Sequence, residues 1–279
     1  MKKVKAGILL TLAVSLLTGC MGSGPSKLSN DYVTVENFQG VEIEKVEVKE
    51  ATEENVDKVV NHLMEGYIAE HDLPENTEIT DEIVVNAQMS ETAETVEELR
   101  AELKSKIKTA REEAARHEEE LRVWEIVMDN SEIHEYPEER LAEVKQGLVD
   151  LYESYAAQEG KEYEEYMEAI GLTDADLDEA AEATLKQELV ANLIAEHFAL
   201  KPTDEELQKR TEAYADEYGF TTVELLYTAV SEDEMYEMIL RDIVKSWLTD
   251  RCKYVEASET DAAEESAGDT AGETGDTEE

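Results

Sequence analysis

The feature that most constrains the fold is the run from Thr95 to Asn130, which contains neither proline nor glycine. Thr95 and Glu98 form a capping box, a pattern that commonly opens a helix. Apolar residues then recur at steps of three and four, as one face of a helix requires: Leu99, Leu103, Ile107, Ala110, Ala114, Leu121, Trp124 and Met128. The run predicts a single helix on the order of 50 Å long. Because alanines and His117 interrupt its apolar stripe, we expect a partner helix to cover only part of it.

Proline, glycine and capping residues divide the following chain into shorter helices. Pro137 with two glutamates after it suits a helix start, while Gly160 and Pro202 mark two helix ends. The sequence predicts helices at 137–159, 161–170, 173–201, 203–218, 223–230 and 231–247.

The region before the long helix carries the convincing β pattern. Between Asp31 and Glu50 the apolar residues occupy alternate positions, as in half-buried strands: Val33, Val35, Val41, Ile43, Val46 and Val48. Asn37 to Gly40 supplies a turn between two strands, and a helix follows from Thr52. The predicted fold class is therefore mostly α, an elongated multi-helix domain at 81–255 preceded by a small N-terminal β-hairpin plus helix at 32–80.

The charge balance narrows the range of partners. The chain has 70 acidic and 25 basic residues and a net charge of -45. Such a molecule repels polyanions, which excludes nucleic acid as an expected partner, and it suits an extended, well-solvated helical shape. Residues 256–279 lack any positive charge or any aliphatic residue larger than alanine, so we expect a disordered acidic tail.

Residues 1–19 have the pattern of a secretory signal peptide. Three lysines precede an apolar run from Ala6 to Leu17, which is too short for a permanent membrane span. The run ends in Leu17-Thr18-Gly19-Cys20, which resembles the bacterial lipobox. That resemblance implies cleavage before Cys20 and attachment of fatty acyl chains, such as palmitate, to make a lipoprotein. The alternative is an ordinary cleaved signal followed by a chance cysteine.

The lipidated form sets the expected location and thiol chemistry. Two or more acyl chains would hold the protein stably on the extracytoplasmic face of the bacterial cell membrane, with residues 20–31 as a flexible tether. Cys252 would then be the remaining thiol, so no internal disulfide is expected.

The sequence offers no catalytic or metal-binding motif. Asp174, Asp176 and Asp178 superficially match the start of an EF-hand loop. Glu179 and Leu185 stand where that loop needs glycine and glutamate, so a calcium site is rejected. The five histidines lack paired-ligand spacing, and nucleotide-binding and hydrolase motifs are absent. We therefore predict no catalytic residues, no metal, no cofactor and no small-molecule substrate.

A set of tyrosines and methionines on successive short helices is the remaining candidate site. Tyrosine combines an apolar ring with a polar tip, and methionine adapts its shape. Together they suit weak binding of varied unfolded chains, and the predicted client-binding residues are Tyr152, Tyr155, Tyr163, Tyr166, Met167, Tyr214, Tyr218, Tyr227 and Met235. Tyr236 and Met238 belong to the same pattern. The alternative for each residue is an ordinary core position.

Short motifs in a fixed order carry a family resemblance across Thr95 to about Val255. They are Thr95-Val-Glu-Glu-Leu-Arg, Asn130-Ser131 before Tyr136-Pro137-Glu138, Glu159-Gly160 with Tyr163 and Tyr166, Gly171-Leu172-Thr173, Ala195-Glu196, and Thr203-Asp204-Glu205-Glu206. This block resembles the C-terminal chaperone domain of bacterial trigger factor, and it is similar in idea to the helical part of SurA-like exported foldases. Val33 to Asp57 resembles the lead-in to that family's FKBP-type isomerase domain.

The resemblance implies a chaperone, but two domains of that family are expected to be missing from this chain. In that family the isomerase core should lie after Leu73, but here only Pro74 to Thr80 intervenes before Asp81-Glu82-Ile83-Val84, which resembles the segment that follows the isomerase domain. We therefore expect the isomerase core to be missing, and likewise the family's ribosome-docking domain. The expected function is a membrane-anchored holdase for unfolded or nascent exported polypeptides. Two alternatives stay open: a prolyl cis-trans isomerase, and a helical lipoprotein that docks one specific envelope partner.

Overall fold

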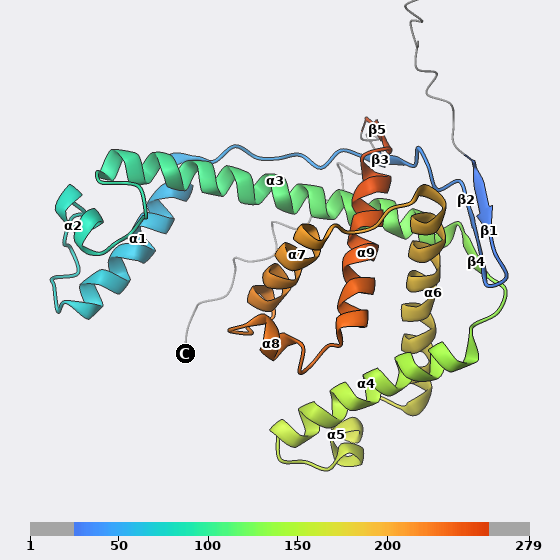
Figure 1. Cartoon of the computed structure of the whole chain (residues 1–279). Helices are drawn as coiled ribbons and strands as arrows, with labels where there is room; N and C mark the ends of the chain where they lie inside the picture. Colours follow the sequence, from blue (N-terminus) through green and yellow to red (C-terminus); the bar gives the residue numbers. More distant parts are fainter. Residues whose placement is uncertain (1–24, 257–279) are drawn as a thin grey trace, which may run out of the picture.

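The computed structural model describes residues 25–256 (Figure 1). The predicted signal peptide, the predicted lipidation site Cys20 and residues 257–279 of the predicted acidic tail lie outside the described residues. The helices are α1 (Glu53–Glu70), α2 (Asp81–Asn86), α3 (Val96–Asp129), α4 (Glu138–Gln158), α5 (Tyr163–Ile170), α6 (Asp174–Phe198), α7 (Asp204–Glu217), α8 (Val223–Leu226) and α9 (Glu232–Thr249). The short strands are β1 (Lys27–Ser29), β2 (Val33–Glu36), β3 (Glu42–Glu44), β4 (Ser131–Ile133) and β5 (Lys253–Val255). The mostly α fold class is confirmed.

The long helix α3 is the spine of the molecule. It runs for 34 residues, and Thr95 caps its start with Glu98 as predicted. Figure 1 shows α1 and α2 at its N-terminal end, and the strands, α6 and α9 toward its C-terminal end. Leu121 remains 46% exposed, so partner helices cover only part of the predicted stripe.

Side-chain caps explain where most of the helices begin. Capping boxes, in which the cap side chain and the residue three positions later satisfy each other's backbone N–H, open α1, α3, α6, α7 and α9. These local signals are the reason that the sequence locates these starts within one or two residues.

The predicted hairpin between β2 and β3 is wrong. β2 pairs antiparallel with β1 and β4, whereas β3 pairs in parallel with β5. Asn37 and Gly40 both adopt positive φ, but the bend they make carries Phe38 into the core instead of reversing the strand. The N-terminal hairpin joins β1 to β2, and its turn is held by the Asn30 side-chain oxygen, which accepts hydrogen bonds from the backbone N–H groups of Tyr32 and Val33. Residues 27–29, expected as tether, are therefore a strand.

The third pair of alternating valines forms no strand. Residues 45–50, here called the strap, run extended along α3 from β3 to α1 (Figure 1). The buried Glu119 of α3 accepts a hydrogen bond from the Val46 N–H at 3.1 Å, and Arg111 donates to the Glu50 carbonyl at 2.7 Å. Side chains of α3 thus satisfy backbone groups that a neighbouring strand would satisfy in a sheet.

The apolar cores lie at separate places along the spine. The body core combines residues of β2, α3, α6 and α9 with Phe38, Val41 and Ile43. A second core at the other end of α3 packs α1 and α2 on its first turns, including Val56, Val84 and Leu99. A third core joins α7, α8 and α9. The apolar core of the described residues is thus divided among three clusters.

Candidate functional site

The nine predicted client-binding residues fall into two groups. Tyr152, Tyr155, Tyr163, Tyr166 and Met167 belong to α4 and α5, residues 138–170, which we call the first arm. Tyr214, Tyr218 and Tyr227 belong to the second arm, α7 and α8 at residues 204–227, and Met235 lies on α9 beside it. Figure 1 shows the first arm projecting below the body beside α6, and the second arm beside α9. The structure does not gather all nine residues into one patch.

Ion pairs fasten the first arm to α6. Arg140 of α4 donates to both carboxylate oxygens of Glu188 on α6, with its shortest contact at 2.9 Å. Lys145 reaches Asp174 and Asp178 at the start of α6, at 3.0 and 2.6 Å. A two-point contact between a guanidinium and a carboxylate fixes orientation as well as distance, so the first arm has a defined direction.

The first arm exposes apolar side chains along its length. Tyr155 is 42% exposed, Leu151 44% and Ile170 43%. Tyr152 and Tyr155 contact edge to face, with ring centroids 6.2 Å apart. Tyr163 and Tyr166 are half-buried, so they present only part of each ring.

The second arm exposes a different pair of side chains. Tyr218 is 55% exposed and Leu225 47%. The Tyr214 ring stacks on Tyr218 with centroids 5.8 Å apart, and the Tyr214 hydroxyl donates to Asp242 of α9. Burial and that hydrogen bond raise the pKa of Tyr214 well above its usual value, so this hydroxyl stays a donor and anchors the exposed ring beside it. Tyr227 is half-buried against the core of this arm.

Three of the sequence assignments need correction. Met167 and Met235 were predicted on the exposed lining, but both are buried, Met235 completely. Met235 lies in the α7–α8–α9 core, so these two methionines stabilise the arms rather than line them. Leu151 stands at helical spacing from Leu148 and Val144, which predicts a place on the apolar stripe of its helix, but it is exposed. Ile170 and Leu225 were missed because one apolar residue near a helix end gives no periodic signal.

The two arms approach each other through α9. A Cβ atom added at Gly147 of α4 would lie 3.6 Å from the Glu234 carboxylate in the first turn of α9. α9 also supplies the side chains that pack under the second arm. The first arm therefore reaches the helix that supports the second arm.

The described part of the chain holds no group of three or more histidine, cysteine, aspartate or glutamate side chains placed to bind a metal ion. Cys252 is a half-buried free thiol.

No helix among residues 25–256 combines the length and the apolar character needed to cross a lipid bilayer.

Comparison with known proteins assigns the region that contains both arms. The family model described as "Bacterial trigger factor protein (TF) C-terminus" matches residues 95–250, from the cap of α3 to the end of α9. A trigger factor of Pediococcus pentosaceus is 30% identical over 159 residues, which cover 56% of this chain and 35% of that protein. A trigger factor of Streptococcus mutans is 27% identical over 180 residues, covering 63% of this chain and 42% of that protein.

A relative from a third genus gives a similar picture. A trigger factor of Caldicellulosiruptor saccharolyticus is 32% identical over 146 residues, covering 51% of this chain and 33% of that protein. The aligned regions thus span between a third and about two-fifths of the length of these relatives. The family match covers more than half of the present chain, and its residues are those of the spine, both arms and α9. The chain therefore belongs to the family of the bacterial trigger factor C-terminus.

Proposed function

We propose that this protein is a chaperone of the holdase type, anchored by lipid on the extracytoplasmic face of a bacterial membrane, which binds unfolded segments of exported proteins. The observation that carries the proposal is the exposure of apolar side chains on two arms of a trigger factor C-terminal domain. Binding requires no covalent chemistry, cofactor or metal. Family membership supports the chaperone activity, and the sequence of residues 1–20 supports the anchor.

The arms suit a client without a fixed shape. Leu151 and Tyr155 are exposed four residues apart on α4, and Tyr218 and Leu225 are exposed on the second arm. Such small, separate patches give weak contacts one by one, but a flexible chain that reaches both arms gains from linkage. A folded partner would need one continuous complementary surface instead.

Charge selects among the clients. The loop and helix of the first arm carry Glu159, Glu162, Glu164, Glu165 and Glu168 around the exposed rings. Opposite charge speeds encounter and raises specificity. Segments that alternate apolar and basic residues are therefore the preferred clients, and the acidic surface keeps a loaded complex in solution.

The central test is suppression of aggregation of a refolding client protein by the purified chain. Replacing Leu151, Tyr155 and Tyr218 together by serine is expected to abolish suppression, because these exposed side chains supply the binding surface. Tyr32, 39% exposed on the β1–β2 turn away from the arms, provides the control variant Tyr32→Ser, which should act like the unaltered chain. Equal activity of the triple variant and the control would refute the assignment to the arms.

Two further measurements separate the alternatives. Acceleration of prolyl isomerisation in a peptide, without suppression of aggregation, would favour an isomerase. Capture of one stoichiometric envelope protein, in place of many unfolded clients, would favour a dedicated docking protein.

The anchor is tested independently by cell fractionation. Cys20→Ser removes the proposed lipidation site and is expected to move the protein from the membrane fraction to the soluble fraction. If the variant stays in the membrane fraction, the anchor does not depend on Cys20.

A further inference from the structure

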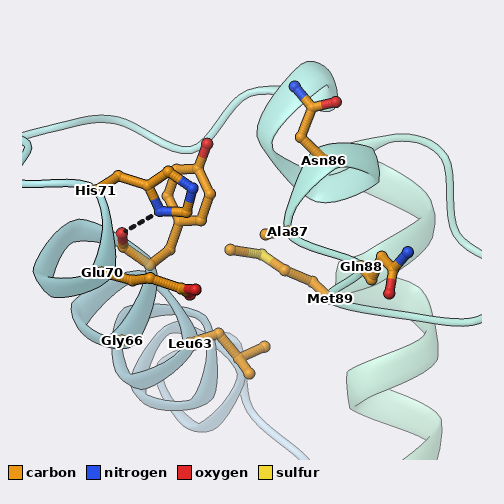
Figure 2. Close-up of a pocket in the computed structure, with 9 residues that line it drawn as sticks. Leu63, Gly66, Glu70, His71, Asn86, Ala87, Gln88 and Met89 are labelled. Carbon is orange, nitrogen blue, oxygen red and sulfur yellow. Dashed lines mark hydrogen bonds between the residues drawn. The ribbon is translucent and has the colours of Figure 1, made fainter.

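A cavity of about 490 Å³ lies at the α1–α2 end of the molecule. It is bounded by the C-terminal half of α1 and by the segment that follows α2 (Figure 2). Leu63, Gly66, Glu70 and Met89 are among its lining residues. This size is in the range of pockets that hold small ligands or single side chains. All of the lining residues precede Thr95, so the cavity lies outside the family match and apart from both arms.

The walls suit a long side chain with an apolar stem. The Tyr67 and His71 rings form one wall, with centroids 4.2 Å apart and an interplanar angle of 31°. The His71 Nδ1 donates to the Tyr67 carbonyl at 3.0 Å, which fixes the imidazole (dashed line in Figure 2). Figure 2 shows the Met89 side chain extending into the space between the two segments, with Leu63 below it. Met89 is flexible enough to follow the shape of an inserted stem.

The electrostatics of the cavity favour a cation. Glu70 ends α1 and forms no ion pair with any residue between 25 and 256. The last turn of α1 carries no basic residue to offset the negative end of the helix. The surrounding stretch 61–90 contains no lysine or arginine, and its acids are Glu65, Glu70, Asp72, Glu75, Glu78, Asp81 and Glu82. A guanidinium also interacts favourably with an aromatic ring, and the Tyr67 ring, which packs against His71, is among the residues that line the cavity.

We propose that this cavity binds a long basic side chain, arginine in preference to lysine, from an extended polypeptide. The stem would lie against Leu63 and Met89, and the charged head would lie between the Glu70 carboxylate and the Tyr67 ring. This is a second peptide-binding site, and it would operate even with the arms disabled. It gives the molecule a recognition element for basic segments at the far end of the spine.

Gly66 allows the cavity to be filled without disturbing the fold. It lies inside α1, and a Cβ atom added there would have no neighbour within 4 Å. Gly66→Leu is expected to project into the cavity, and Gly66→Ala is the matched control that leaves it open. Both changes raise helix propensity, so loss of binding by the leucine variant alone identifies occlusion.

The binding assay uses the full chain and a fluorescein-labelled Gly-Ser peptide that carries arginines, measured by anisotropy. Replacing arginine by its neutral isostere citrulline, or Glu70 by glutamine, is expected to weaken binding about tenfold, since each removes a charge-assisted hydrogen bond. Glu75→Gln makes the same change of net charge outside the cavity and should have little effect. Gly66→Leu should weaken binding to the same degree as citrulline, and a lysine peptide should bind with intermediate affinity.

Several outcomes would overturn this inference. Equal losses from Glu70→Gln and Glu75→Gln would show diffuse attraction without a site, and full binding by Gly66→Leu would exclude the cavity. The same variants test the arms independently of the cavity. Gly66→Leu should still suppress aggregation, and the triple arm variant should still bind the arginine peptide.

Discussion

Ala199 ends α6 in a left-handed backbone conformation, with φ 53° and ψ 37°. The Leu200 N–H donates to the Ala195 carbonyl at 2.8 Å, which closes the helix end. A Cβ atom is unfavourable in this conformation, whereas glycine adopts it freely. The glycine that often ends a helix is therefore missing here, and Pro202 marks this helix end in the sequence.

The first prediction is that Ala199→Gly stabilises the protein. Relief of the left-handed strain should raise the free energy of unfolding by about 1 kcal/mol in urea titrations. Ala183→Gly is the matched control, because Ala183 is exposed in the middle of the same helix. It should lower the free energy by about 1 kcal/mol. A destabilising Ala199→Gly would contradict the argument.

Glu237 on α9 is a carboxylate in an unfavourable place. Burial raises its pKa, and the nearby Glu188 and Asp233 act in the same direction, against a hydrogen bond from Asn192 at 3.0 Å and the charge of Arg140. A pKa raised by folding means that stability is greatest below the unfolded pKa and falls as pH rises through the folded value. Ionised Glu237 therefore destabilises the α6–α9 contact at neutral pH.

The second prediction concerns Glu237→Gln, which keeps the acceptor for Asn192 and removes the charge. The variant should be more stable than the unaltered chain at pH 7, and the difference should vanish below about pH 4, where the glutamate is protonated in both states. Urea unfolding at the two pH values measures this. A difference of the same size at both would assign the effect to packing instead of ionisation.

At the scale of elements, the two ion-pair connections of the first arm differ in kind. Arg140 holds Glu188 by a two-point contact in which Glu188 is only 15% exposed. The acids that pair with Lys145 are 80% and 56% exposed. Shielded charge-assisted bonds are worth more than pairs in water, so the two contacts should contribute unequally.

The third prediction is that Arg140→Ala loosens the first arm. It should lower the free energy of opening in α4 by about 1.5 kcal/mol, seen as faster amide exchange in α4 and α5, with α1 little changed. Lys145→Ala, on the same helix, should lower it by less than about 1 kcal/mol. Equal effects of the two variants would contradict the distinction.

Among the elements, those set by local signals could be predicted from the sequence, and those set by distant contacts could not. Helix starts were predictable because a cap such as Thr203 with Glu206 acts within one turn. The pairing of β3 with β5 was not, since it depends on contacts across almost the whole described chain. Leu151 does follow the helical periodicity of α4. It is nevertheless exposed, because α4 has a packed neighbour along only part of its length. The sequence pattern likewise placed Tyr218 and Met235 in one candidate set, although Tyr218 is exposed and Met235 is buried in the core.

At the scale of the whole molecule, the long helix α3 separates two units that have their own apolar cores. The α1–α2 end has its own core of Val56, Val84, Leu99 and neighbours. The arms project from a body whose core is remote from that end. A net charge of -45 opposes a compact shape, because like charges repel. An open arrangement along one long helix spreads that charge while each core stays buried.

The parallel pairing of β3 with β5 has a consequence for the order in which the protein forms during synthesis. Val41, near the start of the described chain, accepts a backbone hydrogen bond from Lys253, near its end. The body core also needs α9. The ribosome must therefore release nearly the whole chain before the body can close, whereas α1, α2 and the first turns of α3 can pack early. The body therefore stays open, with the edge of β3 unpaired, until Lys253 and its neighbours have left the ribosome.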